Sequence, residues 1–173
     1  RIITYGGLFF FGVAGILSVQ ARPKPRFEKM KESYIVRSAD WELEAWTSYG
    51  TAVKLSKQIE KVKDGLVEYF HFKLQSSHKL RILVLKDEAA FSAHSKEALG
   101  EVFYMQGYYS ADQNEVVVWN KKPASAMLTI LSHELTHAFI YQLYTHPPVW
   151  VNEGICDYIA SGSIRRGKFE RGA

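Results

Sequence analysis

The sequence predicts a fold of the α+β class, and three stretches of the chain carry this prediction. Apolar residues recur at intervals of three and four from Ala52 to Tyr69, which indicates a long amphipathic helix. Residues 80–85 form a short apolar run typical of a buried strand. Residues 103–110 and 115–119 are rich in β-forming side chains and flank a turn-like tetrad, so we expect an antiparallel hairpin. The chain of 173 residues suits one globular domain with a hydrophobic core.

The N-terminal segment has the composition of a signal peptide or a membrane anchor. Residues 2–19 follow Arg1, contain no charged side chain and lead into small residues, as secretory signals do. The run also approaches the length of a bilayer span, and its four glycines disfavour the alternative of a buried core helix. We therefore expect residues 1–21 to bring the protein to an extracytoplasmic location, secreted or attached to a membrane of the cell envelope. The basic residues that follow favour the cytoplasmic side of a membrane and argue in the opposite direction.

Residues 22–32 are basic, contain two prolines and are expected to link this segment to a domain at residues 33–163. A short strand is expected at residues 34–36. Asp40 can cap a helix whose first turn is acidic, so we expect the long helix to begin there. Residues 87–99 are polar and compatible with a second helix.

The strand predicted at Val116, Val117 and Val118 has two interpretations. Its strong β propensity and apolar character indicate a core strand. The alternative is a sheet edge that binds an extended peptide as an additional strand.

The net charge of +4 is concentrated at the two ends of the chain. Residues 1–31 carry +5 and residues 165–173 carry +3, so the remaining chain carries −4. A nucleic-acid-binding domain shows a basic surface on its folded body, and we therefore expect no nucleic-acid partner. Residues 164–173 are expected to form a basic tail that is solvated or contacts anionic lipid.

The segment His133-Glu134-Leu135-Thr136-His137 indicates a metal site. Histidines four residues apart on a helix project from the same face, and their imidazoles can bind one Zn²⁺ ion. Glu134 projects further round the helix, where it can act as a general base on a water molecule. Pro123 can begin this helix, and apolar residues at intervals of three and four mark its buried side.

A third ligand is expected from a second helix that begins after the turn at Pro147 and Pro148. Glu153 and Asp157 are four residues apart and share one face of that helix. Two helices joined by a short connection lie alongside each other, so Glu153 can complete the metal site. Asp157, one turn further on, can accept a proton from a ligand imidazole and orient it.

The single cysteine of the chain, Cys156, lies on this second helix. One cysteine cannot form an internal disulfide, and the sequence lacks the further cysteines of a thiolate zinc site. We expect Cys156 to be a small buried residue, with a thiolate ligand that competes with Glu153 as the alternative.

With these residues, the segment 133–158 resembles the gluzincin metallopeptidases of the peptidase MA clan, nearest to its small bacterial families of exported or envelope proteins. In that clan HExxH is completed by a downstream glutamate, commonly in an N-E-G-x-x-x-Y context like that of Asn152 to Tyr158. The resemblance implies a thermolysin-like zincin subdomain. Such a subdomain contains a small, mostly antiparallel sheet, an active-site helix and a glutamate helix, and the edge strand of its sheet binds substrate. It also implies roles for individual residues. His133, His137 and Glu153 are implied as Zn²⁺ ligands, Glu134 as general base and Asp157 as the partner of a ligand histidine.

The residue that stabilises the oxyanion is not identified by the sequence, and Tyr158, Tyr144, Tyr109 and His146 are the candidates. The first hypothesis is a zinc-dependent metallopeptidase that hydrolyses a peptide or protein substrate. The alternative is an envelope-anchored binding or scaffold protein with a vestigial zinc site. A metal-dependent amidase would share the chemistry of the first hypothesis and differ in its substrate.

Overall fold

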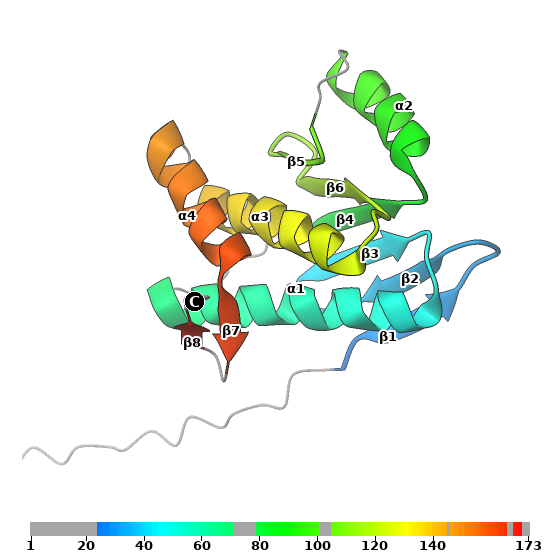
Figure 1. The fold of residues 1–173 in the computed structure, drawn as a ribbon, viewed down its shortest axis with the longest axis horizontal. Coiled ribbons are helices and arrows are strands. Elements are labelled where there is room, and N and C mark those ends of the chain that lie inside the picture. The colour runs from blue at the N-terminus through cyan, green and yellow to red at the C-terminus, as the bar shows by residue number, and fades with distance from the viewer. Residues whose placement is uncertain (1–23, 71–78, 101–104, 145, 166–167, 171–173) are drawn as a thin grey trace, which may run out of the picture.

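In the computed structural model, a mixed β-sheet of six strands carries helices on both of its faces (Figure 1). The structure describes residues 24–70, 79–100, 105–144, 146–165 and 168–170. This architecture confirms the predicted α+β class. The expected signal peptide or anchor, residues 1–21, lies outside the described residues. Within the described ranges, no helix is both long enough and apolar enough to cross a membrane.

The sheet expected to be mostly antiparallel is mixed, with three antiparallel and two parallel strand pairs. Its strands are β1 (Arg26–Lys29), β2 (Tyr34–Arg37), β3 (Trp41–Ala45), β4 (Leu80–Leu85), β5 (Gly107–Ser110) and β6 (Glu115–Trp119). They lie in the order β1-β2-β3-β4-β6-β5. Helical connections join β3 to β4 and β4 to the hairpin that contains β6, and parallel neighbours require such crossovers.

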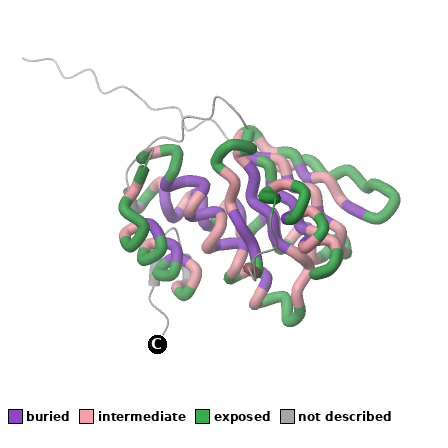
Figure 2. The backbone as a smooth tube through the Cα atoms, turned by 90° about the horizontal axis from the view of Figure 1, so that it is seen from above, coloured by how far each residue is buried: buried purple, intermediate pink, exposed green. Residues whose placement is uncertain are grey.

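The helices of the described chain are α1 (Tyr49–Phe70), α2 (Glu88–Leu99), α3 (Ala124–Leu143) and α4 (Val149–Ser161). Successive side chains of a strand point to opposite faces of a sheet. Ile82 and Val84 of β4 are therefore buried among residues of α1 and α3, whereas Leu83 between them is buried with Phe91 of α2. α1, α3 and α4 thus share one face of the sheet, and α2 covers the other (Figure 1). The buried residues are concentrated in the interior of the fold (Figure 2).

The prediction that the long helix begins at Asp40 is wrong, because the residues that follow form β3. Alternate side chains of β3 are buried from Trp41 to Ala45, which is the pattern of a strand and not of a helix. Asp40 instead binds the buried ammonium group of Lys63, with 2.6 Å between Oδ2 and Nζ. α1 begins only at Tyr49. Its predicted apolar stripe is buried at Ala52, Leu55, Ile59, Val62 and Leu66, and the Tyr69 side chain lies outside the described residues.

The second predicted helix and the predicted hairpin are both confirmed. The carboxylate of Asp87 accepts a hydrogen bond from the backbone nitrogen of Ala90 at 2.8 Å and caps α2, and Gly100 ends α2 at a φ of 77°. β5 and β6 pair antiparallel, while residues 103–104 of the expected hairpin lie outside the described part of the chain.

β6 lies between β4 and β5 and its valines are buried, so it is a core strand. The alternative that β6 is the peptide-binding edge is wrong, because β5 occupies that edge.

Two segments expected to be a linker and a tail contain strands. Residues 26–29 of the expected linker 22–32 form β1, which pairs with β2. At the expected tail, residues 164–173, β7 (Ser163–Arg165) and β8 (Lys168–Glu170) pair as a separate two-stranded sheet, and β7 begins one residue before that tail. The folded part of the chain therefore extends beyond residues 33–163 on both sides. The basic composition of β1 does not prevent its backbone pairing, because the side chains of this edge strand are exposed.

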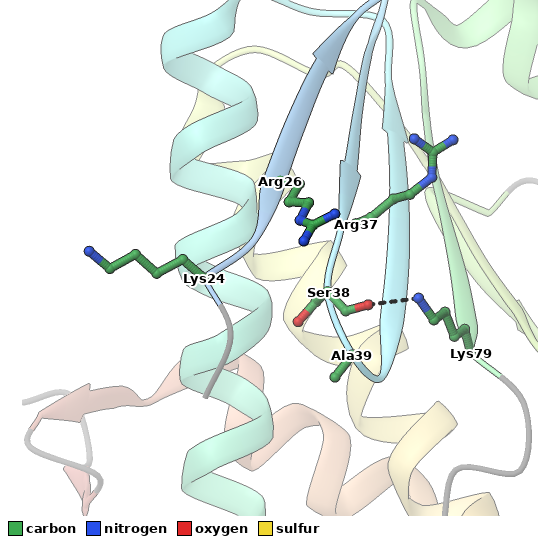
Figure 3. A pocket seen from close by; sticks show the side chains of 6 residues that line it. All are labelled: Lys24, Arg26, Arg37, Ser38, Ala39 and Lys79. Carbon is green, nitrogen blue, oxygen red and sulfur yellow. Dashed lines mark hydrogen bonds between the residues drawn. The ribbon is translucent and has the colours of Figure 1, made fainter. Parts of the chain in front are cut away.

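The basic residues around β1 line a hollow of about 270 Å³ at the sheet edge opposite β5 (Figure 3). Four cationic side chains contribute to it, those of Lys24, Arg26, Arg37 and Lys79. Guanidinium nitrogens of Arg37 lie 2.6 and 2.9 Å from two glutamate carboxylates. Nζ of Lys79 donates a hydrogen bond of 2.9 Å to a backbone carbonyl. Two of the four cations are therefore engaged within the fold.

α3 and α4 begin where the sequence predicts. Pro123 immediately precedes α3 and Pro148 immediately precedes α4. The predicted buried side of α3 is confirmed at Leu131, Leu135 and Phe139, which belong to the main core. This packing sets the orientation of α3 and leaves its flank to the site described next.

Candidate metal centre and cleft

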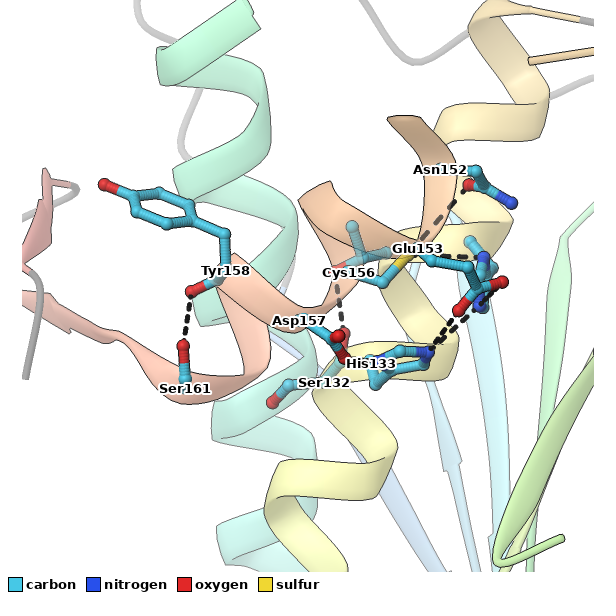
Figure 4. Close-up of polar contacts among 10 residues, drawn as sticks. Ser132, His133, Asn152, Glu153, Cys156, Asp157, Tyr158 and Ser161 are labelled. Atoms are coloured by element: carbon cyan, nitrogen blue, oxygen red, sulfur yellow. Dashed lines mark hydrogen bonds and ion pairs between the residues drawn. The ribbon is translucent and has the colours of Figure 1, made fainter. Parts of the chain in front are cut away.

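The HExxH residues lie on a flank of α3, next to its buried apolar side. The side chain of His133 is 22% exposed and that of His137 is 12% exposed, so both imidazoles reach solvent at the edge of the core. α4 packs against α3 and directs Glu153 and Asp157 toward His133 (Figure 4). The two helices therefore bring together residues that are 16 to 24 positions apart in the chain.

Donor atoms of three side chains converge in this cluster at separations close to those around a tetrahedral metal ion. Nε2 of His133 lies 3.1 Å from Nε2 of His137. Oε2 of Glu153 lies 3.4 Å from Nε2 of His133, and the other carboxylate oxygen, Oε1, lies 3.6 Å from Nε2 of His137. Ligands held about 2.0–2.1 Å from a tetrahedral Zn²⁺ are separated from each other by about 3.3–3.4 Å. The three side chains therefore have the proximity expected of ligands to one zinc ion.

The other ring nitrogen of each histidine contacts α4. Nδ1 of His133 lies 3.1 Å from Oδ1 of Asp157, and Nδ1 of His137 lies 3.2 Å from Sγ of Cys156. A neutral imidazole whose Nδ1–H donates to such a partner presents the lone pair of Nε2. Burial lowers the pKa of His137, which keeps its ring neutral. Both histidines are thus prepared to bind a cation through Nε2.

Cys156 forms an alternative cluster with the two histidines. One potential ligand atom from each of these residues lies within 4.8 Å of the others. The sulfur, however, contacts Nδ1 of His137, on the opposite side of the ring from the converging Nε2 atoms. Burial raises the pKa of the Cys156 thiol, and neighbouring carboxylates raise it further. We therefore consider Glu153 the better third ligand and Cys156 a buried partner of His137.

Glu134 lies beside the converging atoms, and its carboxyl group is largely buried. Burial raises the pKa of its carboxyl group to about 8, and the nearby charge of Glu153 contributes to the shift. The side chain lines two hollows, which meet at His133, Glu134 and Gly107. A carboxylate with this pKa can take up a proton near neutral pH and release it again.

The two hollows form a cleft between α4 and β5. The hollow on one side of Glu134 has a volume of about 390 Å³ and is lined by Tyr109, Tyr141 and Asn152, among others. The hollow on the other side has a volume of about 590 Å³, and Ile130 is part of its wall. β5 forms one rim of both, because it is the sheet edge nearest to α3.

The candidate oxyanion residues are not all at the cleft. Tyr109 lines it, whereas Tyr158, Tyr144 and His146 are absent from the lining of either hollow. The Tyr158 ring projects away from His133 (Figure 4).

Sequence reasoning missed three residues that the structure brings to the cleft. The ring centroids of Tyr141 and Tyr109 lie 5.7 Å apart. Tyr141 is four residues after His137, and this spacing indicates that it shares the helix face of the metal site. Asn152 is buried and lines the same hollow. Gly107 allows β5 to approach α3, and this approach has no sequence signal because it depends on how the hairpin packs.

No family model and no curated protein sequence matches this chain. Its function is therefore inferred from the donor atoms and the cleft themselves.

Proposed function

We propose that the protein is a zinc-dependent metallopeptidase with a thermolysin-like zincin subdomain. The observation that carries this proposal is the convergence of His133, His137 and Glu153 beside Glu134 in an open cleft. Three protein ligands leave a tetrahedral ion one position for water or substrate, which is typical of catalytic and not of structural zinc. The resemblance of residues 133–158 to gluzincins supports the same assignment.

His133, His137 and Glu153 would hold the ion, and Asp157 would keep the His133 ring in its metal-binding orientation through Nδ1. A zinc ion held there would act as a Lewis acid, which would make water more acidic and polarise a carbonyl group. The donor set of two imidazoles and one carboxylate agrees with that of known catalytic zinc sites.

Glu134 supplies the proton transfers of the reaction. Hydrolysis adds one water molecule across a peptide bond: the carbonyl carbon gains an oxygen, and the C–N bond breaks. Glu134 takes the proton that leaves the water and delivers it to the departing nitrogen, so the carboxylate is regenerated in each cycle. Its position at the meeting point of the two hollows brings the Glu134 carboxylate near a bound peptide bond.

The substrate would bind in an extended conformation along β5. One side of this strand pairs with β6, and no described strand pairs with the other side. Free backbone groups at such an edge can bind a peptide as an additional strand. We assign stabilisation of the oxyanion to the hydroxyl groups of Tyr109 and Tyr141, since both rings line the cleft beside His137.

Replacement of single carboxylates tests this proposal. Glu134→Gln should keep zinc bound and lower peptide hydrolysis at least about a hundredfold, because the proton acceptor is lost. Glu153→Gln should lower the zinc content after dialysis, because a neutral amide is a weaker ligand. Glu97→Gln on α2, an exposed residue away from the cleft, is the matched control and should change neither quantity.

Hydrolysis that survives Glu134→Gln would contradict the assigned proton acceptor, and an unchanged zinc content in Glu153→Gln would remove Glu153 from the ligands. The alternative function, an envelope-anchored binding or scaffold protein with a vestigial site, predicts bound zinc without hydrolysis in the parent protein. The extracytoplasmic location and the membrane association through residues 1–21 are further parts of the proposal, and cell fractionation tests them.

A further inference from the structure

We infer that the cleft binds an extended polypeptide on both sides of the reacting bond, so that the protein cuts internal peptide bonds and not terminal residues. This inference rests on the proposed peptidase function and adds the class of substrate to it. Each cut would consume one water molecule and produce one new carboxylate and one new amine, both from the interior of the substrate chain.

The first support is that the reacting position lies in the middle of the cleft. The two hollows share His133, Glu134 and Gly107, and they extend from there in opposite directions along α3. One reaches Ala126 and the other reaches Tyr141. Neither end of the substrate therefore has to stop at the metal site.

The length of the cleft agrees with an internal segment. Glu134 lies eight residues after Ala126 and seven before Tyr141. At a rise of about 1.5 Å per helical residue, these intervals correspond to about 12 and 10 Å. An extended peptide advances about 3.3 Å per residue, so each side has room for about three residues. A terminal-residue peptidase needs such room on one side only.

The second support is the absence of a charged anchor for a chain terminus among the described residues that line the cleft. An aminopeptidase requires an acidic group for the substrate ammonium. The acidic side chains of the lining are Glu134, Glu153 and Asp157, and the metal site uses all three. A carboxypeptidase requires a cation for the substrate carboxylate, and neither described lining contains lysine or arginine.

One cation does contact a residue of the lining. Nζ of Lys121 donates a hydrogen bond to Oε1 of Gln106 and lies 5.5 Å from the centroid of the Trp119 ring. These interactions already occupy the ammonium group. Replacement of Lys121 by alanine tests whether its ammonium group also binds a substrate carboxylate, because only that role would make the variant lose activity selectively on peptides with a free C-terminus.

The larger hollow also indicates which side chains it accepts. Its wall contains Met105, Ala126, Ile130 and Ala160, and Thr129 and Gln106 are uncharged. Apart from the metal-site residues His133, Glu134 and Asp157, which also line this hollow, its described wall offers no charge that would compensate the desolvation of a charged side chain. The substrate residues on this side of the cut should therefore be predominantly uncharged.

The test uses two libraries of dodecapeptides with the same randomised sequences. One library has free termini, and the other is acetylated at the N-terminus and amidated at the C-terminus. The zinc-loaded full chain should cut both libraries at rates within about twofold, with cuts at least three residues from either end in mass spectra. Cuts confined to the terminal residues, or a tenfold or greater loss on blocking either terminus, would overturn the inference and leave the peptidase proposal intact.

Binding provides a readout that does not depend on turnover. Fluorescence anisotropy should show that Glu134→Gln binds a labelled blocked peptide and its free-ended counterpart with similar affinity. If the parent protein cuts neither library, the peptidase proposal fails. In that case, equal binding supports the two-sided cleft, and dependence on free termini refutes it.

Substitutions at the end of the larger hollow complete the test. Ala126→Trp should fill that end and lower both cleavage and binding of blocked peptides about tenfold. Ser125→Trp, on the same turn of α3 but outside the lining, is the matched control and should leave both near the parent value. Lys121→Ala should leave the ratio of cleavage between the two libraries unchanged, and a selective loss for free carboxylates would reveal a carboxypeptidase. Equal effects of the two tryptophan substitutions would show that the larger hollow does not bind substrate.

Discussion

Alanine in place of Gly107 should destabilise the protein, because β5 and α3 approach each other there without room for a side chain. A Cβ atom at this position would lie 2.8 Å from Cγ2 of Ile130 and 2.9 Å from Cγ1 of Val118. It would also lie 3.1 Å from Cγ of Glu134. Favourable contacts between carbon atoms are about 3.5–4.0 Å long, so the strand and the helix must separate by about half an ångström or more.

Overpacking of this kind costs about 1–3 kcal/mol. In a domain of 150–250 residues, each kcal/mol lowers the melting temperature by about 2–4 °C. The metal-free Gly107→Ala variant should therefore melt about 2–12 °C below the parent protein. Thermal unfolding in the presence of a chelator, followed by circular dichroism, measures this shift, and urea titration measures the change in the free energy of unfolding.

Gly154→Ala is the matched control, because a Cβ atom at this position, on the exposed side of α4, would have nothing within 4 Å of it. Alanine stabilises a helix interior by about 0.5–1 kcal/mol relative to glycine, so this variant should melt about 1–4 °C above the parent. The expected result is that the melting temperature falls in Gly107→Ala and rises in Gly154→Ala. A Gly107→Ala variant as stable as the parent would refute the close approach of β5 to α3.

Three further predictions concern the site and the core. Burial raises the pKa of Glu134 from 4.5 to about 8. Between pH 4.5 and pH 8, the folded protein therefore keeps a proton on this carboxyl group that the unfolded chain has released. The metal-free protein should therefore lose stability as the pH rises from about 5 to 8, by up to a few kcal/mol, and urea titrations should show a smaller loss in Glu134→Gln. Asp157→Asn should weaken zinc binding about 10- to 100-fold, because the His133 ring loses its charged partner. Competition with a chromogenic chelator measures this affinity, and an unchanged value would show that the contact does not orient the ring. Leu131→Ala removes a fully buried side chain from the main core and should lower the free energy of unfolding by about 2–5 kcal/mol. Urea titration measures this change, and a loss below about 1 kcal/mol would contradict the packing of α3.

Much of α3 and α4 could be predicted from the sequence, because the relevant signals are local. Proline marks the start of each helix, and intervals of three and four mark the buried side of α3. The spacing of four also puts His133 beside His137, and Glu153 beside Asp157, before any tertiary contact is known. Local signals failed at Asp40, where a suitable helix cap precedes a strand whose alternation spans only five residues.

Long-range pairing decided the rest. The sequence indicates strands at residues 103–110 and 115–119, but only the order of the sheet makes β5 the edge beside α3 and buries β6. The separations of 3.1 to 3.6 Å among donor atoms of His133, His137 and Glu153 likewise depend on how α4 packs against α3. The contact of Cys156 with His137 depends on the same packing. Helical periodicity acts over a few residues of one element, so the sequence by itself determined which side chains share a face. Which faces meet depends on burying the core as a whole, and only the tertiary structure determined it.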